Sequence, residues 1–87
     1  MKREDTLEKA KELISSDRAK IYGDALENHK RIAMMWTSLL GKEINPHDVH
    51  KCMIAVKLAR LIEPPDHLDS VVDIIGYAAL YGEITND

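Results

Sequence analysis

Residues 49–80 read VHKCMIAVKLARLIEPPDHLDSVVDIIGYAAL, two mainly apolar segments separated by a pair of prolines. In the first segment, Val49, Met53 and Val56 recur at the three- and four-residue intervals that place side chains on one face of an α-helix. Pro64-Pro65 ends this helix, because proline lacks the backbone N–H that a helix uses and disfavours helical geometry at the preceding residue. We expect the second segment to form another helix, antiparallel to the first.

Both helices of this expected hairpin have recognisable starts. Asn45 can accept a hydrogen bond from the first turn as an N-cap, and Pro46 stands at the first helical position, where its missing N–H is not needed. Asp66 is the expected cap of the second helix. We therefore expect the two helices to begin directly after Asn45 and Asp66.

Two further helices are expected before this hairpin. The first covers about residues 5–15, where apolar side chains recur at helical spacing among charged ones. The second begins after Asp24, with Glu27 as its capping-box partner, and ends at Gly41. No segment alternates for long enough to build a sheet, so we predict an all-α fold, a compact four-helix domain spanning residues 1–87. The apolar stripe of the second helix is expected to contain Ile32, Met35, Trp36 and Leu39.

The last helix carries apolar residues around most of its circumference. At about 100° per residue, they are interrupted by a single stripe. A chain of 87 residues has a small core, which cannot cover a helix that is apolar on so many sides. We therefore expect a homo-oligomer that assembles through the last two helices. The interrupting stripe contains Asp69, Asp73, Gly76 and Tyr77.

Composition excludes several classes of partner. A net charge of −3 and a pI near 5.8 argue against binding to duplex nucleic acid, which favours a basic surface. No stretch approaches the roughly 20 apolar residues of a membrane span, and the first residues lack the apolar run of a signal peptide. Cys52 is the single cysteine, as suits a reducing compartment. We predict a cytoplasmic protein with no membrane partner.

Four charged residues of the hairpin stand in unusual places. Lys57 and Arg60 are neighbours on one helix face, with Arg60 inside the apolar arc and Lys57 at its edge. Buried cations are rare unless they are paired, and Asp69 and Asp73 on the next helix are available partners. These residues form either a structural ion-pair network or a pocket in which cations hold phosphate and carboxylates hold a metal or a base edge.

A second cluster, residues 18–24, precedes a helix N-terminus, where backbone N–H groups attract anions. Lys20 and Tyr22 are candidate ligand-binding residues, whereas Asp24 is better explained as a cap. Tyr22 or Tyr77 would stack on a base. The four histidines do not form a zinc pattern. Trp36 is expected in the core and Cys52 buried and inert.

Several blocks of the sequence resemble a small phage and prophage family of unknown function. They begin with Lys20-Ile-Tyr-Gly-Asp, Asn28-His29 and residues 32–36, and continue with residues 52–61 and 67–78. The family in turn resembles the all-α nucleoside triphosphate pyrophosphatases, the MazG-like and dimeric dUTPase-like enzymes. A phage origin would place the protein in the cytoplasm of the host cell.

The resemblance to these enzymes implies a magnesium site built from paired carboxylates. Asp73 matches their final aspartate, and Ser70 stands where the preceding glutamate would be, with Asp69 beside it. Lys57 and Arg60 stand at the spacing of the first acidic pair, with the opposite charge. Two cations hold phosphate well and concentrate magnesium poorly, so the resemblance favours a nucleotide pocket over catalysis.

Three hypotheses follow. The first is a phage-type nucleotide-binding protein without a cofactor, whose pocket at the oligomer interface sequesters a nucleotide signal of host immunity. The second is a magnesium-dependent pyrophosphohydrolase, with metal on Asp69 and Asp73, helped by Glu27 or Glu63. The third is a structural oligomer without a small ligand. The ligand-binding residues of the first hypothesis are Lys20, Tyr22, Lys57, Arg60, Asp69, Asp73 and Tyr77.

Overall fold

The computed structural model describes residues 1–15 and 24–86, and these form four helices and no strand. The all-α prediction is therefore confirmed for the described residues. None of the described helices is long and apolar enough to cross a membrane. The helices are α1 (Arg3–Leu13), α3 (Ala25–Leu40), α4 (Pro46–Arg60) and α5 (Leu68–Asn86).

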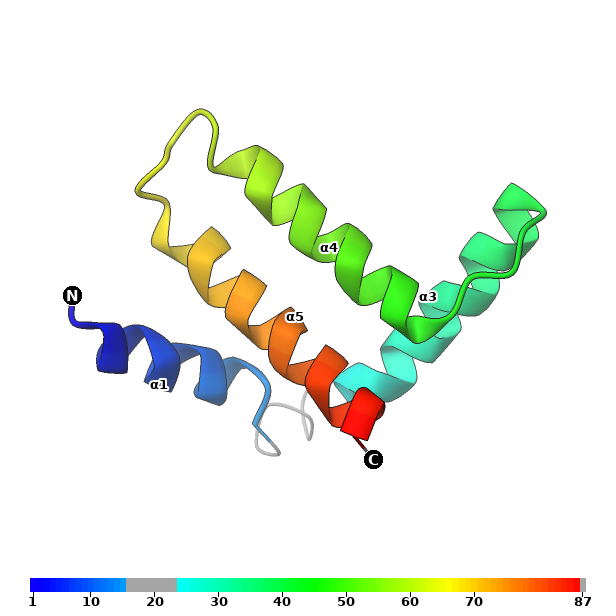
Figure 1. Ribbon diagram of the computed structural model, residues 1–87, viewed down its shortest axis with the longest axis horizontal. Coiled ribbons are helices and arrows are strands. Elements are labelled where there is room, and N and C mark those ends of the chain that lie inside the picture. Colours follow the sequence, from blue (N-terminus) through cyan, green and yellow to red (C-terminus); the bar gives the residue numbers. More distant parts are fainter. Residues whose placement is uncertain (16–23, 87) are drawn as a thin grey trace.

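Helix α5 is the centre of the arrangement. It runs antiparallel to α4 as the expected hairpin, and α1 lies along its other side (Figure 1). Helix α3 packs against the beginning of α4 and extends away from the other helices (Figure 1). The polypeptide between α4 and α5 contains Pro64-Pro65, as the sequence predicts.

Most helix ends follow the predicted capping chemistry. Asp24 accepts a hydrogen bond from the Glu27 amide at 3.2 Å, although the Glu27 side chain pairs with Lys30 instead of closing a capping box. The Asn45 side chain accepts from the Asp48 amide at 3.1 Å, and the Asn45 backbone amide donates in return to the Asp48 carboxylate at 3.0 Å. These side chains satisfy backbone N–H groups that a helix start leaves without partners.

The expected cap at Asp66 is wrong. Helix α5 begins at Leu68, so His67 immediately precedes it and Asp66 lies one residue too early. The His67 imidazole is bound instead to the Ser70 hydroxyl, with 2.7 Å between Nδ1 and Oγ. This bond spans the first turn of α5. The side-chain hydrogen bond at the start of α5 is therefore made by His67 and Ser70, and not by the expected Asp66.

The corner between α3 and α4 is fixed by one hydroxyl. Thr37 Oγ1 donates to the Ala33 carbonyl at 2.8 Å and accepts from the Ile44 amide at 2.9 Å. Gly41, which ends α3, adopts the left-handed conformation with φ of 66°. This conformation suits glycine, because a Cβ atom there approaches the following carbonyl oxygen.

The core is thin. Its buried apolar residues among the described ones are only five, and two of them are alanines. Polar side chains fill part of the remaining interior, as described below for His29 and His50. A core of this size is small even for a short domain. The buried apolar residues are Ala10, Ala33, Val49, Val72 and Leu80.

The predicted apolar stripe of α3 does not face the core. Met35 is 64% exposed and Leu39 is 80% exposed, and Trp36 is only half-buried. The side of α3 that meets the rest of the chain presents His29 and Ala33. This face presents a small residue, Ala33, and a polar one, His29. A prediction based on large apolar side chains therefore does not identify it.

Two glycine substitutions test these local conformations. Gly41→Ala should lower the free energy of unfolding by about 1 kcal/mol, because its left-handed backbone is strained for alanine although an added Cβ meets nothing within 4 Å. Gly82→Ala, inside α5 and equally unobstructed, should raise it by roughly 0.5–1 kcal/mol. Urea denaturation measures both, and equal effects of the two changes would contradict the assignment at Gly41.

Candidate functional site

Two histidines meet in the interior where α3 crosses α4. His29 Nδ1 and His50 Nε2 are 2.9 Å apart, and the two rings are nearly perpendicular, at 76°. The residues are 6% and 0% exposed, so this hydrogen bond is sheltered from water. A buried bond between side chains of different helices orients both rings, because neither can turn without leaving a polar atom without a partner.

Both imidazoles are held in the neutral state. The pKa of His50 is lowered to about 4, mainly by burial and to a smaller extent by repulsion from His29 and His47. Burial also lowers the pKa of His29, against the opposing attraction of Asp24. The pair is therefore uncharged near neutral pH and can exchange hydrogen bonds but adds no positive charge.

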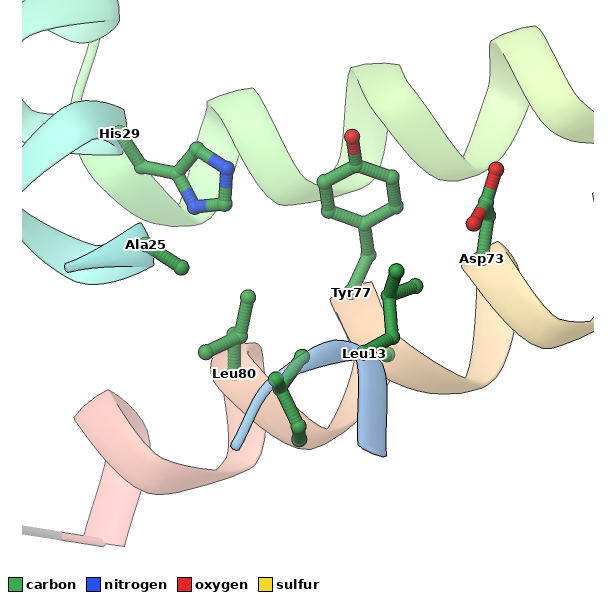
Figure 2. Close-up of a pocket in the computed structure, with 8 residues that line it drawn as sticks. Leu13, Ala25, His29, Asp73, Tyr77 and Leu80 are labelled. Atoms are coloured by element: carbon green, nitrogen blue, oxygen red, sulfur yellow. The ribbon is translucent and has the colours of Figure 1, made fainter. Parts of the chain in front are cut away.

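His29 also borders a pocket between α1, α3 and α5. The pocket has a volume of about 280 Å³. Figure 2 shows His29, Tyr77 and Asp73 following one another along it, with Leu13 and Leu80 on the side nearer the viewer. The walls are thus apolar at the bottom and polar along one edge, the usual composition of a small-molecule site. The lining residues are Leu13, Ile14, Ala25, His29, Asp73, Gly76, Tyr77 and Leu80.

Tyr77 and Asp73 place different chemistry along this edge. The Tyr77 ring lies beside His29, with 5.6 Å between ring centroids. Asp73 Oδ2 forms an ion pair with Lys57 Nζ on α4 at 3.0 Å. The two side chains are 27% and 17% exposed, so water screens this pair only partly. The pocket therefore offers an aromatic face, a carboxylate and a neighbouring ammonium group.

The structure brings together only part of the predicted charge network. Lys57 and Asp73 meet as the hairpin geometry suggests, but Arg60 is exposed and has no ion pair with any described residue. The expectation that Arg60 is covered within an apolar arc is therefore wrong, because the end of α4 is largely exposed, Leu58 and Ala59 included. Asp69 is exposed and lines a second cavity with Lys9 and Glu12, to which Asp73 also contributes. Lys20 and Tyr22 lie outside the described residues.

The described residues contain no group of three or more His, Cys, Asp or Glu side chains that could hold a metal. Asp73 is engaged with Lys57, and Ser70 is buried against His67. Asp69 and Asp73, the pair of aspartates expected to hold metal in an enzyme, line one cavity together, but only Asp73 also lines the pocket beside His29.

Two other sequence interpretations need correction. Cys52 is exposed, not buried, because it lies on a side of α4 that α5 does not cover. An interpretation of the histidines only as possible zinc ligands does not identify the buried pair of His29 and His50. Its signal lay in the helical spacing, because His29 is four residues from Ala33 and His50 adjoins Val49. Both neighbours are buried.

Large apolar side chains are exposed mainly on α3 and α4. Helix α5 contributes none of those found among the described residues, because α1 and α4 cover it. The oligomer prediction rested on an apolar surface of α5, whereas the exposed apolar surface lies mainly on the outer side of α3. The exposed set in α3 is Met34, Met35, Leu39 and Leu40, and in and after α4 it is Val56, Leu58 and Ile62.

These features define a small all-α domain with a half-polar pocket beside His29 and an apolar outer face on α3. The chain belongs to the family described as "Domain of unknown function (DUF6378)", whose model matches residues 5–85. It is 50% identical over 72 residues to the Gene 55 protein of Mycobacterium phage L5, covering 82% of this chain and 46% of that protein. It is 44% identical over 75 residues to the Gene 55 protein of Mycobacterium phage D29, covering 86% and 50% respectively.

The comparisons confirm the predicted membership of a phage family. The chain spans about half the length of the curated relatives it matches. No solved structure matches it.

The histidine pair predicts an acid-sensitive fold. The pKa of His50 is about 4 in the folded protein against an ordinary 6.5, so between these pH values the unfolded chain binds a proton that the folded chain does not. Stability is then complete above about pH 6.5 and falls as the pH drops toward 4, by about 3 kcal/mol. Urea denaturation at a series of pH values measures this loss.

His50→Gln is the matched control for this effect. Glutamine places an amide at the same reach as Nε2 and does not titrate in this range. The variant should lose less stability than the parent between pH 6.5 and 4, because only the other groups then respond. Identical slopes would show that the His50 imidazole does not govern the acid response.

Proposed function

We propose that this domain binds a nucleotide, with the base in the pocket and the phosphate beside Lys57. One observation carries the proposal: Asp73 and Tyr77, predicted from the sequence as ligand-binding residues, line the same pocket. Lys57, predicted as a phosphate ligand, does not line the pocket but lies beside it, with its Nζ 3.0 Å from Asp73 Oδ2. Residues from two helices thus converge on one site.

The size of the pocket favours one ring system. Its volume of about 280 Å³ is at the low end of ligand pockets, which span roughly 300–1,000 Å³. A base fits such a space against Tyr77, whereas the sugar and phosphate extend toward solvent. Leu13, Ile14 and Leu80 supply apolar contact for the face of the base that does not stack.

The charge beside the pocket favours direct phosphate contact. The Lys57 side chain is only 17% exposed, and charge-assisted hydrogen bonds strengthen where water is partly excluded. The described carboxylates do not assemble a metal site, so nothing observed favours the pyrophosphohydrolase. A phage protein that binds a nucleotide without consuming it would act by withholding it from host proteins.

Calorimetry with nucleoside monophosphates, in the presence of a chelator, tests this proposal. Binding should persist without divalent metal, and Lys57→Ala should weaken it by roughly tenfold to a hundredfold, as expected for a lost contact with a charged group. Lys30→Ala is the control, because Lys30 pairs with Glu27 on the exposed side of α3.

Binding that disappears in chelator would favour the metal-dependent enzyme. Equal losses in the Lys57 and Lys30 variants would remove Lys57 from the site. Folding of each variant is checked by its thermal transition, which the Lys30 change should leave within about 0.5 kcal/mol of the parent.

We also propose that a second copy of the chain covers the outer side of α3. A cavity lined by Met34, Met35, Ser38 and Leu39 hollows this side. The described interior buries five apolar residues, two of them alanines, so the monomer lacks the core that usually stabilises a domain. A second copy carries the same face and can pack isologously against it.

A matched pair of charge substitutions tests this interface. Leu39 on α3 is 80% exposed and Ile62 after α4 is 81% exposed, so neither change should disturb the folded monomer. The parent should scatter light with a mass well above 9.9 kDa, and Leu39→Glu should reduce it because an unpaired carboxylate is costly to bury. Ile62→Glu should leave it unchanged. A monomeric parent would refute the interface.

A further inference from the structure

We infer that the pocket selects a guanine base, an inference that rests on the nucleotide binding proposed above. The pocket presents a hydrogen-bond donor at His29 and an acceptor at Asp73, with the Tyr77 ring between them (Figure 2). Each of these three groups constrains the ligand separately. A guanine satisfies all of them, and in the syn conformation its 5′-phosphate lies on the side of the 2-amino group, toward Lys57.

The donor follows from the buried partner of His29. The 2.9 Å bond between His29 Nδ1 and His50 Nε2 leaves two tautomeric arrangements. If His29 donates, His50 carries its proton on Nδ1, an atom that is buried and has no hydrogen-bond partner among the described residues. If His50 donates, that buried atom is a lone pair.

The second arrangement is the more stable one. A buried N–H group without a partner is rarer in proteins than an unsatisfied acceptor. His50 therefore donates from Nε2 to Nδ1 of His29, and the single proton of the His29 imidazole lies on its own Nε2. Because His29 lines the pocket, this N–H is available to an acceptor on a bound ligand.

The acceptor lies at the other end of the edge. Asp73 lines the pocket and engages Lys57 through one lone pair of Oδ2, so Oδ1 and the second lone pair of Oδ2 remain as acceptors. A carboxylate accepts hydrogen bonds through both oxygens and has no donor. The carboxylate therefore favours a ligand edge that carries two neighbouring N–H groups. It repels a ligand edge on which a lone pair lies next to an N–H group.

Among the common bases, guanine best matches this pattern. Its N1–H and 2-amino groups are adjacent donors, and its O6 and N7 atoms supply acceptors elsewhere on the ring. Adenine and cytosine each place a ring nitrogen lone pair beside the amino group, and uracil flanks its N–H with two carbonyl groups. These three bases would set an acceptor against Asp73.

A series of purine monophosphates tests the inference by calorimetry on the parent protein. Guanosine monophosphate should bind at least tenfold more tightly than inosine monophosphate, which lacks only the 2-amino donor. Xanthosine monophosphate should bind more weakly still, because it turns a carbonyl oxygen toward Asp73. Adenosine monophosphate should also be disfavoured by at least tenfold.

Asp73→Asn tests the same contact from the protein side. An amide offers one acceptor and one donor, which match the N1–H and 2-carbonyl groups of xanthine. The variant should therefore reverse the preference, binding xanthosine monophosphate more tightly than guanosine monophosphate. Asp69→Asn, one turn earlier and not among the residues that line this pocket, should leave the order of the parent unchanged.

The outcomes separate this inference from the function on which it rests. If no nucleotide binds, the proposed function fails. If nucleotides bind with equal affinity for every base, or with adenine preferred, the function stands and the guanine selection is overturned. An Asp73→Asn variant that folds and loses affinity equally for all four ligands would also overturn it, because a merely structural role predicts such a uniform loss.

Discussion

The hydrogen bond between His29 and His50 is the interaction on which the geometry of this domain most depends. It lies where α3 meets α4, and at that junction the apolar contribution is small, from Ala33 and Val49. A hydrogen bond between two neutral, buried groups is directional, whereas contact between small apolar residues is not. The pair therefore sets the orientation of α3 and, with it, one wall of the pocket.

This polar junction also accounts for the shape of the molecule. Helix α5 is covered on two sides by α1 and α4, but α3 touches the rest of the chain mainly near its own beginning (Figure 1). Its remaining length carries Met34, Met35, Leu39 and Leu40 into solvent. A short chain cannot both surround its central helix and bury a projecting one, so the apolar surface that it leaves exposed falls on α3.

The charges of the hairpin separate into one buried pair and two solvated groups. Lys57 and Asp73 lie opposite each other between α4 and α5 and form a partly buried ion pair. Arg60 and Asp69 lie on the surface, where water solvates each of them. A partly desolvated pair next to a cavity can exchange one partner for a ligand with little rearrangement, which is why Asp73 and Lys57 carry the proposal and Arg60 does not.

Local patterns in the sequence determined the class of fold and most helix ends. Asn45-Pro46, Asp24 and Gly41 act through backbone groups within one turn, so their effects do not depend on distant parts of the chain. The sequence also offered Asp69 and Asp73 as partners for the cations of α4, because an antiparallel hairpin brings the two stripes together, but only the structure shows that Lys57 pairs with Asp73. Tertiary packing decided which side of α3 is inside, and it chose His29 and Ala33 over Met35 and Leu39. Spacing could mark each histidine as facing the interior, but their contact was beyond reach of the sequence: His29 and His50 are 21 residues apart, and they meet only where two helices cross.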